Sequence, residues 1–199
     1  MPLSLPTTPG NREITWIPQQ AIGRSESPFT LKRQTYDYGS SRWRAIVKLP
    51  PMTRTAASEW LAFFAKVRGS EFYLGDSSKA DVVTAETPRI KTQASSGAVL
   101  ATELWTPSTA DLLAPGDWFD VTAANGKKCL FQVLDAVSSD GSGEATISVF
   151  PNARTTISAT TSLNFTSPQG TFVLDDAPAF NFDQSKLLKG ISFECVQVQ

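Results

Sequence analysis

Alternating apolar and polar positions between residues 42 and 49 predict a β-strand with one buried face. The side chains on the apolar face are Trp43, Ala45, Val47 and Leu49. A period of two is the repeat expected of a half-buried strand. Residues 29–38 are also strand-like, and Gly39-Ser40-Ser41 separates the two segments. The sequence therefore predicts a β-hairpin with its turn at these three residues.

One helix is predicted, from residue 55 to residue 68. Its apolar residues recur at i, i+3, i+4, i+7 and i+10 and form a single stripe: Ala57, Trp60, Leu61, Phe64 and Val67. Gly69 follows the last turn, which is a common way for a helix to end. Phe63 lies off the centre of the stripe. This spacing is typical of a helix that packs across one face of a sheet, with Trp60 in the core.

Short apolar segments separated by turn residues follow from residue 99 onward. The candidate strands are residues 118–122, 128–137, 145–150, 162–166 and 171–174. Strands of this length, interrupted by turns every 8–12 residues or so, predict a small β-barrel or sandwich. Between Asp135 and Gly141 the carboxylates suggest a calcium loop, but the alternating ligands and closing Glu are missing, which favours a hairpin turn. The polar residues 77–97 are predicted to form a loop or linker.

The final segment, residues 187–199, is predicted to be a strand that pairs within the sheet of the first unit. Its apolar phase slips after Cys195, which predicts a β-bulge. The second unit would then be an insertion. We expect a mainly β (α+β) fold, with a β-sandwich-like domain and one packed helix from residues 1–94 and 172–199. Residues 95–171 would form the inserted small β-barrel or sandwich domain.

The charge balance is uneven along the chain. Residues 1–69 hold 10 Lys and Arg against 4 Asp and Glu, whereas residues 70–199 hold 8 against 15, and the net charge is −1. Scattered basic residues of this kind favour protein contacts through complementary potentials over nucleic-acid binding. No apolar run approaches the roughly 18 residues of a membrane span. The start of the chain lacks the pattern of a signal peptide, so we expect assembly in the cytoplasm.

The chemistry available to the chain argues against an enzyme. The sequence contains no histidine, which removes the usual Ser-His and Cys-His nucleophiles and the commonest metal ligand. Paired carboxylates for a glycosidase are better explained as turn formers. No phosphate-binding glycine motif occurs. Cys129 and Cys195 lie far apart in the sequence and are expected to be buried free thiols. We expect no catalytic residues, no metal and no cofactor.

A set of short segments, in fixed order and spacing, carries a family resemblance over most of the chain. These segments are Ser27-Pro28-Phe29 through Gln34, Arg42-Trp43 through Met52, Glu59 through Phe64, Gly69 with Phe72, Leu113 with Pro115 through Phe119, Phe131-Gln132-Val133, Ser138 through Ala145, Phe150 through Arg154, Phe172-Val173-Leu174 and Gly190 through Glu194. Together they resemble the distal tail proteins of long-tailed siphophages that infect proteobacteria, which are ring components of the tail tip or baseplate.

This resemblance implies a structural virion protein that forms a homo-oligomeric ring, usually of six copies, through residues 1–94 and 172–199. The ring would join the tail tube to the hub and host-recognition proteins, so its place is the virion tail tip. Nucleic acid would only pass through the channel. A closed ring needs a head-to-tail interface. Arg42, Arg44 and Lys48 are the candidates for inter-subunit contacts.

A different hypothesis is a carbohydrate-binding β module on a phage tail or cell surface. Trp105 and Trp118 are the candidate glycan contacts, because exposed indole rings stack on sugars at wet interfaces. The simpler interpretation is that Trp118, which stands beside Phe119 and Val121, packs inside the barrel. Trp105 stands beside Thr106-Pro107-Ser108 in a predicted loop. For this residue the sequence favours neither a glycan contact nor a buried position.

Overall fold

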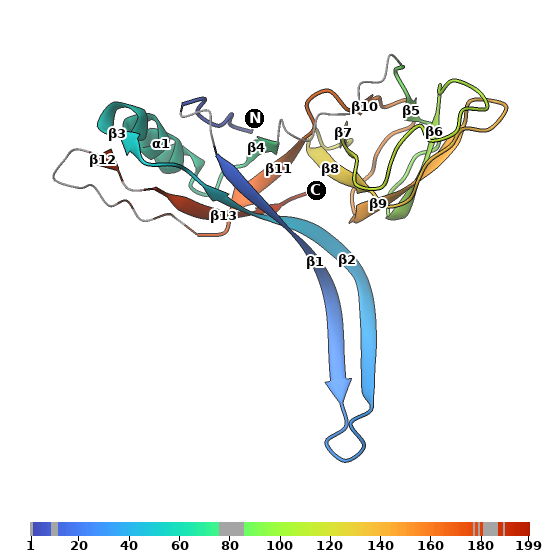
Figure 1. The fold of residues 1–199 in the computed structure, drawn as a ribbon, viewed down its shortest axis with the longest axis horizontal. Coiled ribbons are helices and arrows are strands. Elements are labelled where there is room, and N and C mark those ends of the chain that lie inside the picture. The colour runs from blue at the N-terminus through green and yellow to red at the C-terminus, as the bar shows by residue number, and fades with distance from the viewer. Residues whose placement is uncertain are drawn as a thin grey trace.

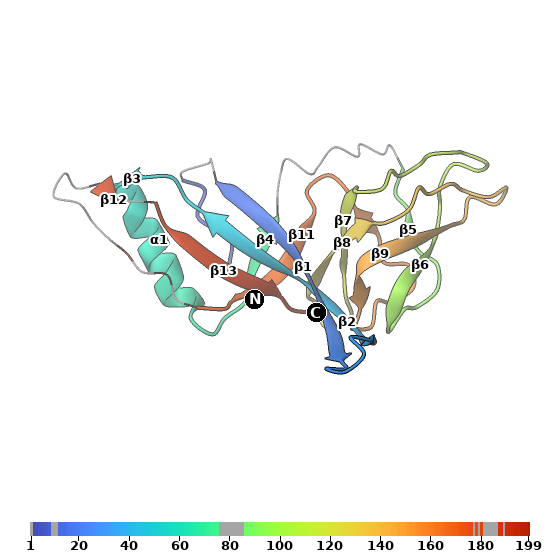
Figure 2. The same cartoon turned by 60° about the horizontal axis from the view of Figure 1, so that its bottom comes forward.

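In the part of the chain that the structure describes, the fold is mainly β with one helix, as the sequence predicts (Figure 1). A computed structural model describes residues 2–8, 12–75, 86–176, 178, 180, 187–188 (backbone only) and 190–199. Two sheets lie side by side and a long two-stranded ribbon projects away from them (Figures 1 and 2). Within the described part of the chain, the helix is too short and too polar to cross a bilayer.

The first sheet has five strands in the order β1-β2-β13-β11-β4. Their bounds are Glu13–Glu26 (β1), Arg33–Lys48 (β2), Ser192–Gln197 (β13), Gln169–Leu174 (β11) and Phe72–Gly75 (β4). All neighbouring strands are antiparallel. The predicted pairing of the last strand is confirmed, because β13 lies between β2 and β11. The bulge predicted near Cys195 is wrong: the register from Ser192↔Lys48 to Val196↔Arg44 is unbroken.

Helix α1, Arg54–Val67, follows β3 (Met52–Thr53), which pairs with β12 (Leu187–Leu188). It packs against the first sheet through aromatic contacts: the rings of Phe64 and Phe193 are 5.0 Å apart, and those of Phe63 and Phe72 5.6 Å. The stripe lies slightly rotated from the predicted one, because Phe63 is buried and Leu61 is only half-buried. The sheet therefore contacts the i, i+3, i+6, i+7 and i+10 positions of the helix.

The second sheet has six strands in the order β10-β7-β8-β9-β6-β5. Their bounds are Leu163–Asn164 (β10), Trp118–Thr122 (β7), Lys128–Val133 (β8), Ala145–Ala153 (β9), Gly97–Glu103 (β6) and Arg89–Ile90 (β5). The sheet curls until its edges meet: the Ile90 amide donates to the Thr161 carbonyl at 2.8 Å, and the Leu163 amide to Pro88 at 3.0 Å. This sheet is therefore barrel-like and encloses a core of its own.

The path of the chain joins the two sheets in a simple way. After β4 the chain leaves the first sheet and builds the whole second sheet, and it then returns through β11. The loop predicted for residues 77–97 contains β5 in its described part, and residues 76–85 lie outside the described residues. The division into a ring domain and an inserted domain, with its limits at residues 94 and 172, stays a prediction.

The hairpin predicted at residues 29–49 has its turn in the wrong place. β2 runs through Gly39-Ser40-Ser41 without reversing, and its hairpin partner is β1, with the connecting turn at residues 27–32. Between the pairs Gln20↔Ser41 and Ile22↔Asp37 the register shifts, and Gly39 has a positive φ of 70°. A glycine in this conformation is typical of a bulge as well as of a turn. The strand β1 was not predicted.

Trp60 is the best single test of the helix packing. Its side chain is fully buried, and its indole N–H donates to the Thr8 carbonyl at 2.7 Å. We expect Trp60→Ala to lower the free energy of unfolding by about 3–5 kcal/mol, because a large cavity forms. Leu61→Ala, on the half-buried neighbour, is the control and should cost much less. Urea unfolding of both variants measures the difference, and equal losses would contradict this packing.

Candidate functional site: an arm anchored on an aromatic seam

The most unusual feature of the molecule is the projecting part of the β1–β2 hairpin, residues 21–40, which we call the arm (Figure 1). Every residue of β2 from Arg33 to Ser40 is exposed. Seven large apolar or aromatic side chains of the described residues are strongly exposed, and four of them belong to the arm: Phe29, Leu31, Tyr36 and Tyr38. Clusters of exposed apolar side chains mark interaction surfaces.

The backbone of the arm is also incompletely paired. β1 lies at the edge of the first sheet, and β13 pairs with β2 only from Arg44 to Lys48. Both outer edges of the arm are therefore free of strand partners in the part of the chain described. An isolated two-stranded ribbon is marginally stable in water, and free strand edges readily pair with another chain. The arm therefore has the properties of a segment that is completed by a partner.

Five aromatic side chains join the two sheets close to the base of the arm, and we call this cluster the seam. Trp16, Trp43 and Phe172 come from the first sheet, and Trp118 and Phe150 from the second. The Trp43 ring lies 4.7 Å from Trp118 and 4.7 Å from Phe150, and Trp16 lies 5.2 Å from Trp118. Each such pair contributes about 0.5–1.5 kcal/mol beyond the burial of its area. The seam thus fixes the strands from which the arm departs.

Hydrogen bonds hold the base of the arm against the second sheet. The backbone N–H of Asn152 donates to the Ser41 hydroxyl at 2.7 Å, and its side-chain amide donates to the Gly39 carbonyl at 2.8 Å. Both partners lie at the register shift where β2 passes from the arm into the body. Strand β9 therefore determines the direction in which the arm leaves the body.

A buried carboxylate ties the second sheet to the returning strand. Asp120 on β7 is 3% exposed and accepts hydrogen bonds from the Gln169 amide at 2.8 Å and the Asn164 side chain at 2.7 Å. Burial raises the pKa of Asp120, although these two bonds and the charge of Lys128 oppose the increase. The group therefore acts as a structural acceptor at the point where the chain re-enters the first sheet.

The three predicted inter-subunit residues have partners within their own chain. Arg42 donates to Gln19 at 2.9 Å, and Lys48 pairs with Glu13 at 3.3 Å. Arg44 pairs with Glu194 and lies 3.9 Å from Asp175, and the bond to Glu194 raises its pKa. Arg42 and Lys48 are exposed and Arg44 is half-buried. Their role between subunits stays a prediction.

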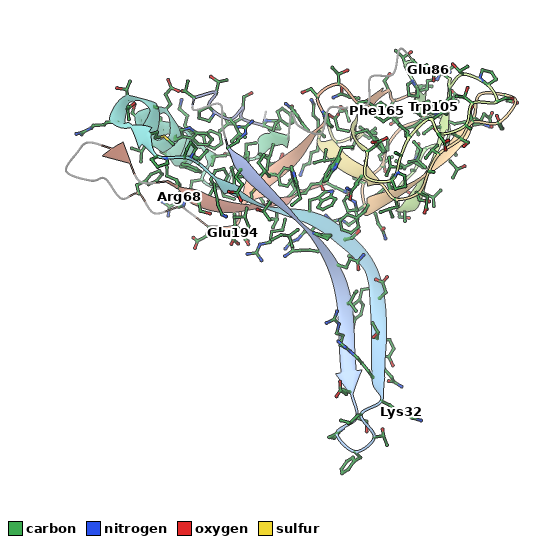
Figure 3. The ribbon with its side chains drawn as sticks, viewed as in Figure 1. Lys32, Arg68, Glu86, Trp105, Phe165 and Glu194 are labelled. Carbon is green, nitrogen blue, oxygen red and sulfur yellow. The ribbon has the colours of Figure 1, made fainter. Side chains whose placement is uncertain are left out.

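The two predicted glycan contacts lie in the interior. Trp105 and Trp118 are each 3% exposed. The Trp105 indole N–H donates to the Thr102 hydroxyl at 2.8 Å, and its ring lies 6.1 Å from Phe165 inside the second sheet (Figure 3). Trp118 belongs to the seam. A sugar could stack on neither ring without a movement of the side chain, so the structure offers no exposed indole at these positions.

The described residues offer no cluster of three or more Asp, Glu, Cys or His side chains that could hold a metal ion. Both thiols are buried and free, as predicted. Burial raises the pKa of the Cys129 thiol to about 12 and also raises that of Cys195. Asp140 accepts bonds from the Ser142 and Glu144 amides at 2.8 and 2.9 Å, which lower its pKa. This is the geometry of a hairpin turn, which the sequence favours over a calcium loop.

The arm is the functional feature that sequence reasoning missed. Its side chains point to solvent on both faces, so it lacks the apolar alternation by which a half-buried strand is recognised. The available signal was the run Ser25-Glu26-Ser27-Pro28, which is rich in turn formers and stands before the exposed Phe29.

Neither a scan against models of known protein families nor a search of curated protein sequences returned a match to this chain.

Asp120 gives a prediction for the pH dependence of stability. Because its pKa is raised, the folded protein binds a proton here more tightly than the unfolded chain. Its contribution to stability therefore falls as the pH rises from the ordinary carboxyl pKa through the raised value. Asp120→Asn should remove this decrease and be at least as stable as the natural protein at pH 7. Denaturant unfolding between pH 4 and 7 or so tests it, with the exposed Asp111→Asn as the control; an unchanged pH profile would contradict it.

Asn152 gives a prediction for the base of the arm. Asn152→Ala removes the bond to Gly39 and should cost about 1 kcal/mol of stability. It should also free the arm, so that a dye on a Phe29→Cys variant shows faster anisotropy decay. Asn125→Ala removes a side-chain bond to Thr155 in a loop of the second sheet and is the control. Identical decays in the two variants would contradict the anchoring of the arm by β9.

Proposed function

We propose that this protein is a structural component of a phage tail tip, in which copies of the chain join through their arms into a closed ring. The resemblance to distal tail proteins supplies the context: a ring of about six copies between the tail tube and the hub, assembled in the host cytoplasm. The DNA would pass through its channel. The proposal includes no enzymatic activity.

The arm is the observation that carries this proposal. It combines two free strand edges with four exposed apolar or aromatic side chains, and it projects away from its own body (Figure 1). A monomer gains nothing from a segment of this kind, which exposes surface and invites aggregation. A neighbouring copy that covers the arm would bury the apolar side chains and pair the open edges.

The contact between an arm and the body of a neighbour would be heterologous, because it joins two different surfaces. Heterologous contacts build rings when the rotation between copies closes, and filaments when it does not. The basic balance of residues 1–69 and the acidic balance of residues 70–199 provide the opposite charges that favour such head-to-tail contacts. Strands held by the aromatic seam keep the direction of the arm constant, which a closing rotation requires.

Removal of the arm tests the proposal. Replacement of residues 21–40 by Asn-Gly would join Gln20 to Ser41, which face each other across β1 and β2, through a two-residue hairpin turn. We expect native mass and negative-stain imaging to show rings with a central channel for the natural protein at high concentration. The truncated variant should remain monomeric at the same concentration.

The thermal unfolding of the truncated variant is the control, because residues 21–40 lie outside both cores. Its midpoint should stay within a few degrees of the natural protein, because the only anchoring bond lost within the described part of the chain is the one from Asn152 to the Gly39 carbonyl, worth about 1 kcal/mol. A natural protein that stays monomeric at every concentration, or a truncated variant that still forms rings, would overturn the role of the arm in assembly.

A further inference from the structure

A groove of about 610 Å³ lies beside the second half of helix α1. One wall consists of the helix residues Leu61, Phe64 and Ala65, and the other of Leu174 and Phe180. The rings of Phe64 and Phe180 are 5.6 Å apart. Leu61 is half-buried and Ala65 is exposed, so an apolar stripe of the helix is open to solvent. Leu61, which the sequence placed in the core stripe, therefore lines this groove.

Carboxylates stand at one side of this groove. Asp175 and Asp176 are both exposed and lie among its lining residues, where they follow directly after β11. Asp175 lies 3.9 Å from Arg44, whose closer partner is Glu194. Asp175 thus shares Arg44 with a closer carboxylate, and Arg68 also lines the groove, so the rim carries both signs of charge. An apolar channel whose rim includes Asp175, a carboxylate with only a distant and shared cation, fits a ligand that combines large apolar side chains with a positive charge.

The tip of the arm has this composition. Phe29 is 94% exposed and Leu31 is 73% exposed, and Lys32 and Arg33 follow directly. Leu31 has a positive φ of 55°, and its amide donates to the Ser27 carbonyl at 2.9 Å within the turn. A bulky non-glycine residue in the left-handed region stores strain, which points to a functional constraint where it occurs. The turn thus holds both apolar side chains outward next to two cations.

The tip does not fill the groove of its own chain. Figure 3 shows Lys32 at the far end of the arm, whereas Arg68, which lines the groove, lies in the body beside the helix. The strand from Gln20 to Glu26 is about 20 Å long at roughly 3.3 Å per residue and points away from the body. If the arm tip occupies such a groove, it must therefore be the tip of a second copy.

We infer that the arm tip of one copy docks into the α1 groove of the next, with Phe29 and Leu31 in the apolar channel and the cations Lys32 and Arg33 on the side of Asp175. This inference rests on the proposed ring and identifies the surface that receives the arm. The donor and acceptor surfaces differ, so each copy uses both, as a ring contact requires. The buried apolar anchors supply most of the affinity, and the exposed ion pairs select the orientation.

Disulfide trapping tests the contact. A Phe29→Cys protein is mixed with an Ala65→Cys protein under mild oxidation, and non-reducing gels record the products. We expect covalent dimers that contain one copy of each variant, and a ladder of oligomers from a Phe29→Cys/Ala65→Cys double variant. The natural thiols do not interfere, because Cys129 and Cys195 are buried. Phe29→Cys mixed with Ser142→Cys, in an exposed turn of the second sheet, is the control and should give no such dimers.

A second set of variants links the contact to assembly. Phe29→Ser/Leu31→Ser should raise the protein concentration needed for half-maximal ring formation more than about tenfold, since the two side chains lose their burial. Val99→Ser/Leu134→Ser, which alters exposed apolar residues of the second unit, is the matched control and should leave that concentration unchanged.

The outcomes separate this inference from the proposed ring. Rings that form normally with the altered tip, without Phe29–Ala65 cross-links, would overturn the groove as the docking site and leave the ring proposal intact. Cross-links between two Phe29→Cys copies instead of the mixed pair would show a tip-to-tip contact and overturn the groove as well. A natural protein that never assembles would overturn both.

Discussion

The packing of five aromatic side chains across the seam is the constraint on which the rest of the structure depends. Each sheet has a core of its own, but the first core continues through Trp118, Leu130 and Phe150 of the second sheet. Buried hydrogen bonds cross the same boundary, including the one from Gln197 to the Leu130 carbonyl at 3.2 Å. The two sheets therefore form one body, and the strands that emerge from the seam have a defined direction.

Because of this constraint, the arm leaves the body in a defined direction. A flexible hairpin with free edges would aggregate with any exposed strand, whereas an arm of fixed direction presents the same edges and the same side chains in every copy. The base of the arm is held by the Asn152 hydrogen bonds, and its tip carries side chains that its own body leaves uncovered. We attribute this contrast between a fixed base and an unpartnered tip to assembly with further copies. In that account the groove beside α1 is the receiving half of the same interface.

The parts of the fold that the sequence predicted are those in which burial imposes a pattern. The alternation from Trp43 to Leu49, the stripe of α1 and the strands β7 to β9 all face a core, and the structure contains each of them. The errors occur where burial is absent or shared. Gly39 was assigned to a turn because a glycine with positive φ occurs in turns and in bulges. A bulge was predicted near Cys195 because the apolar phase of β13 slips at Val196, but the slip arises because both faces of the strand are covered there. The arm left no pattern because neither of its faces is buried, and the seam could not be predicted because Trp43 and Trp118 are far apart in the sequence.

Hydrogen–deuterium exchange of the arm amides, compared between dilute and concentrated protein, tests the central claim most directly. If neighbouring copies complete the arm, the amides of residues 22–37 exchange rapidly in the dilute protein and are protected in the concentrated protein. The peptides that contain Trp43 and Trp118 should be protected equally in both, since the seam is complete within one chain. Arm amides that exchange at the same rate at both concentrations, while the protein assembles, would show that the ring forms through another surface and would contradict the account.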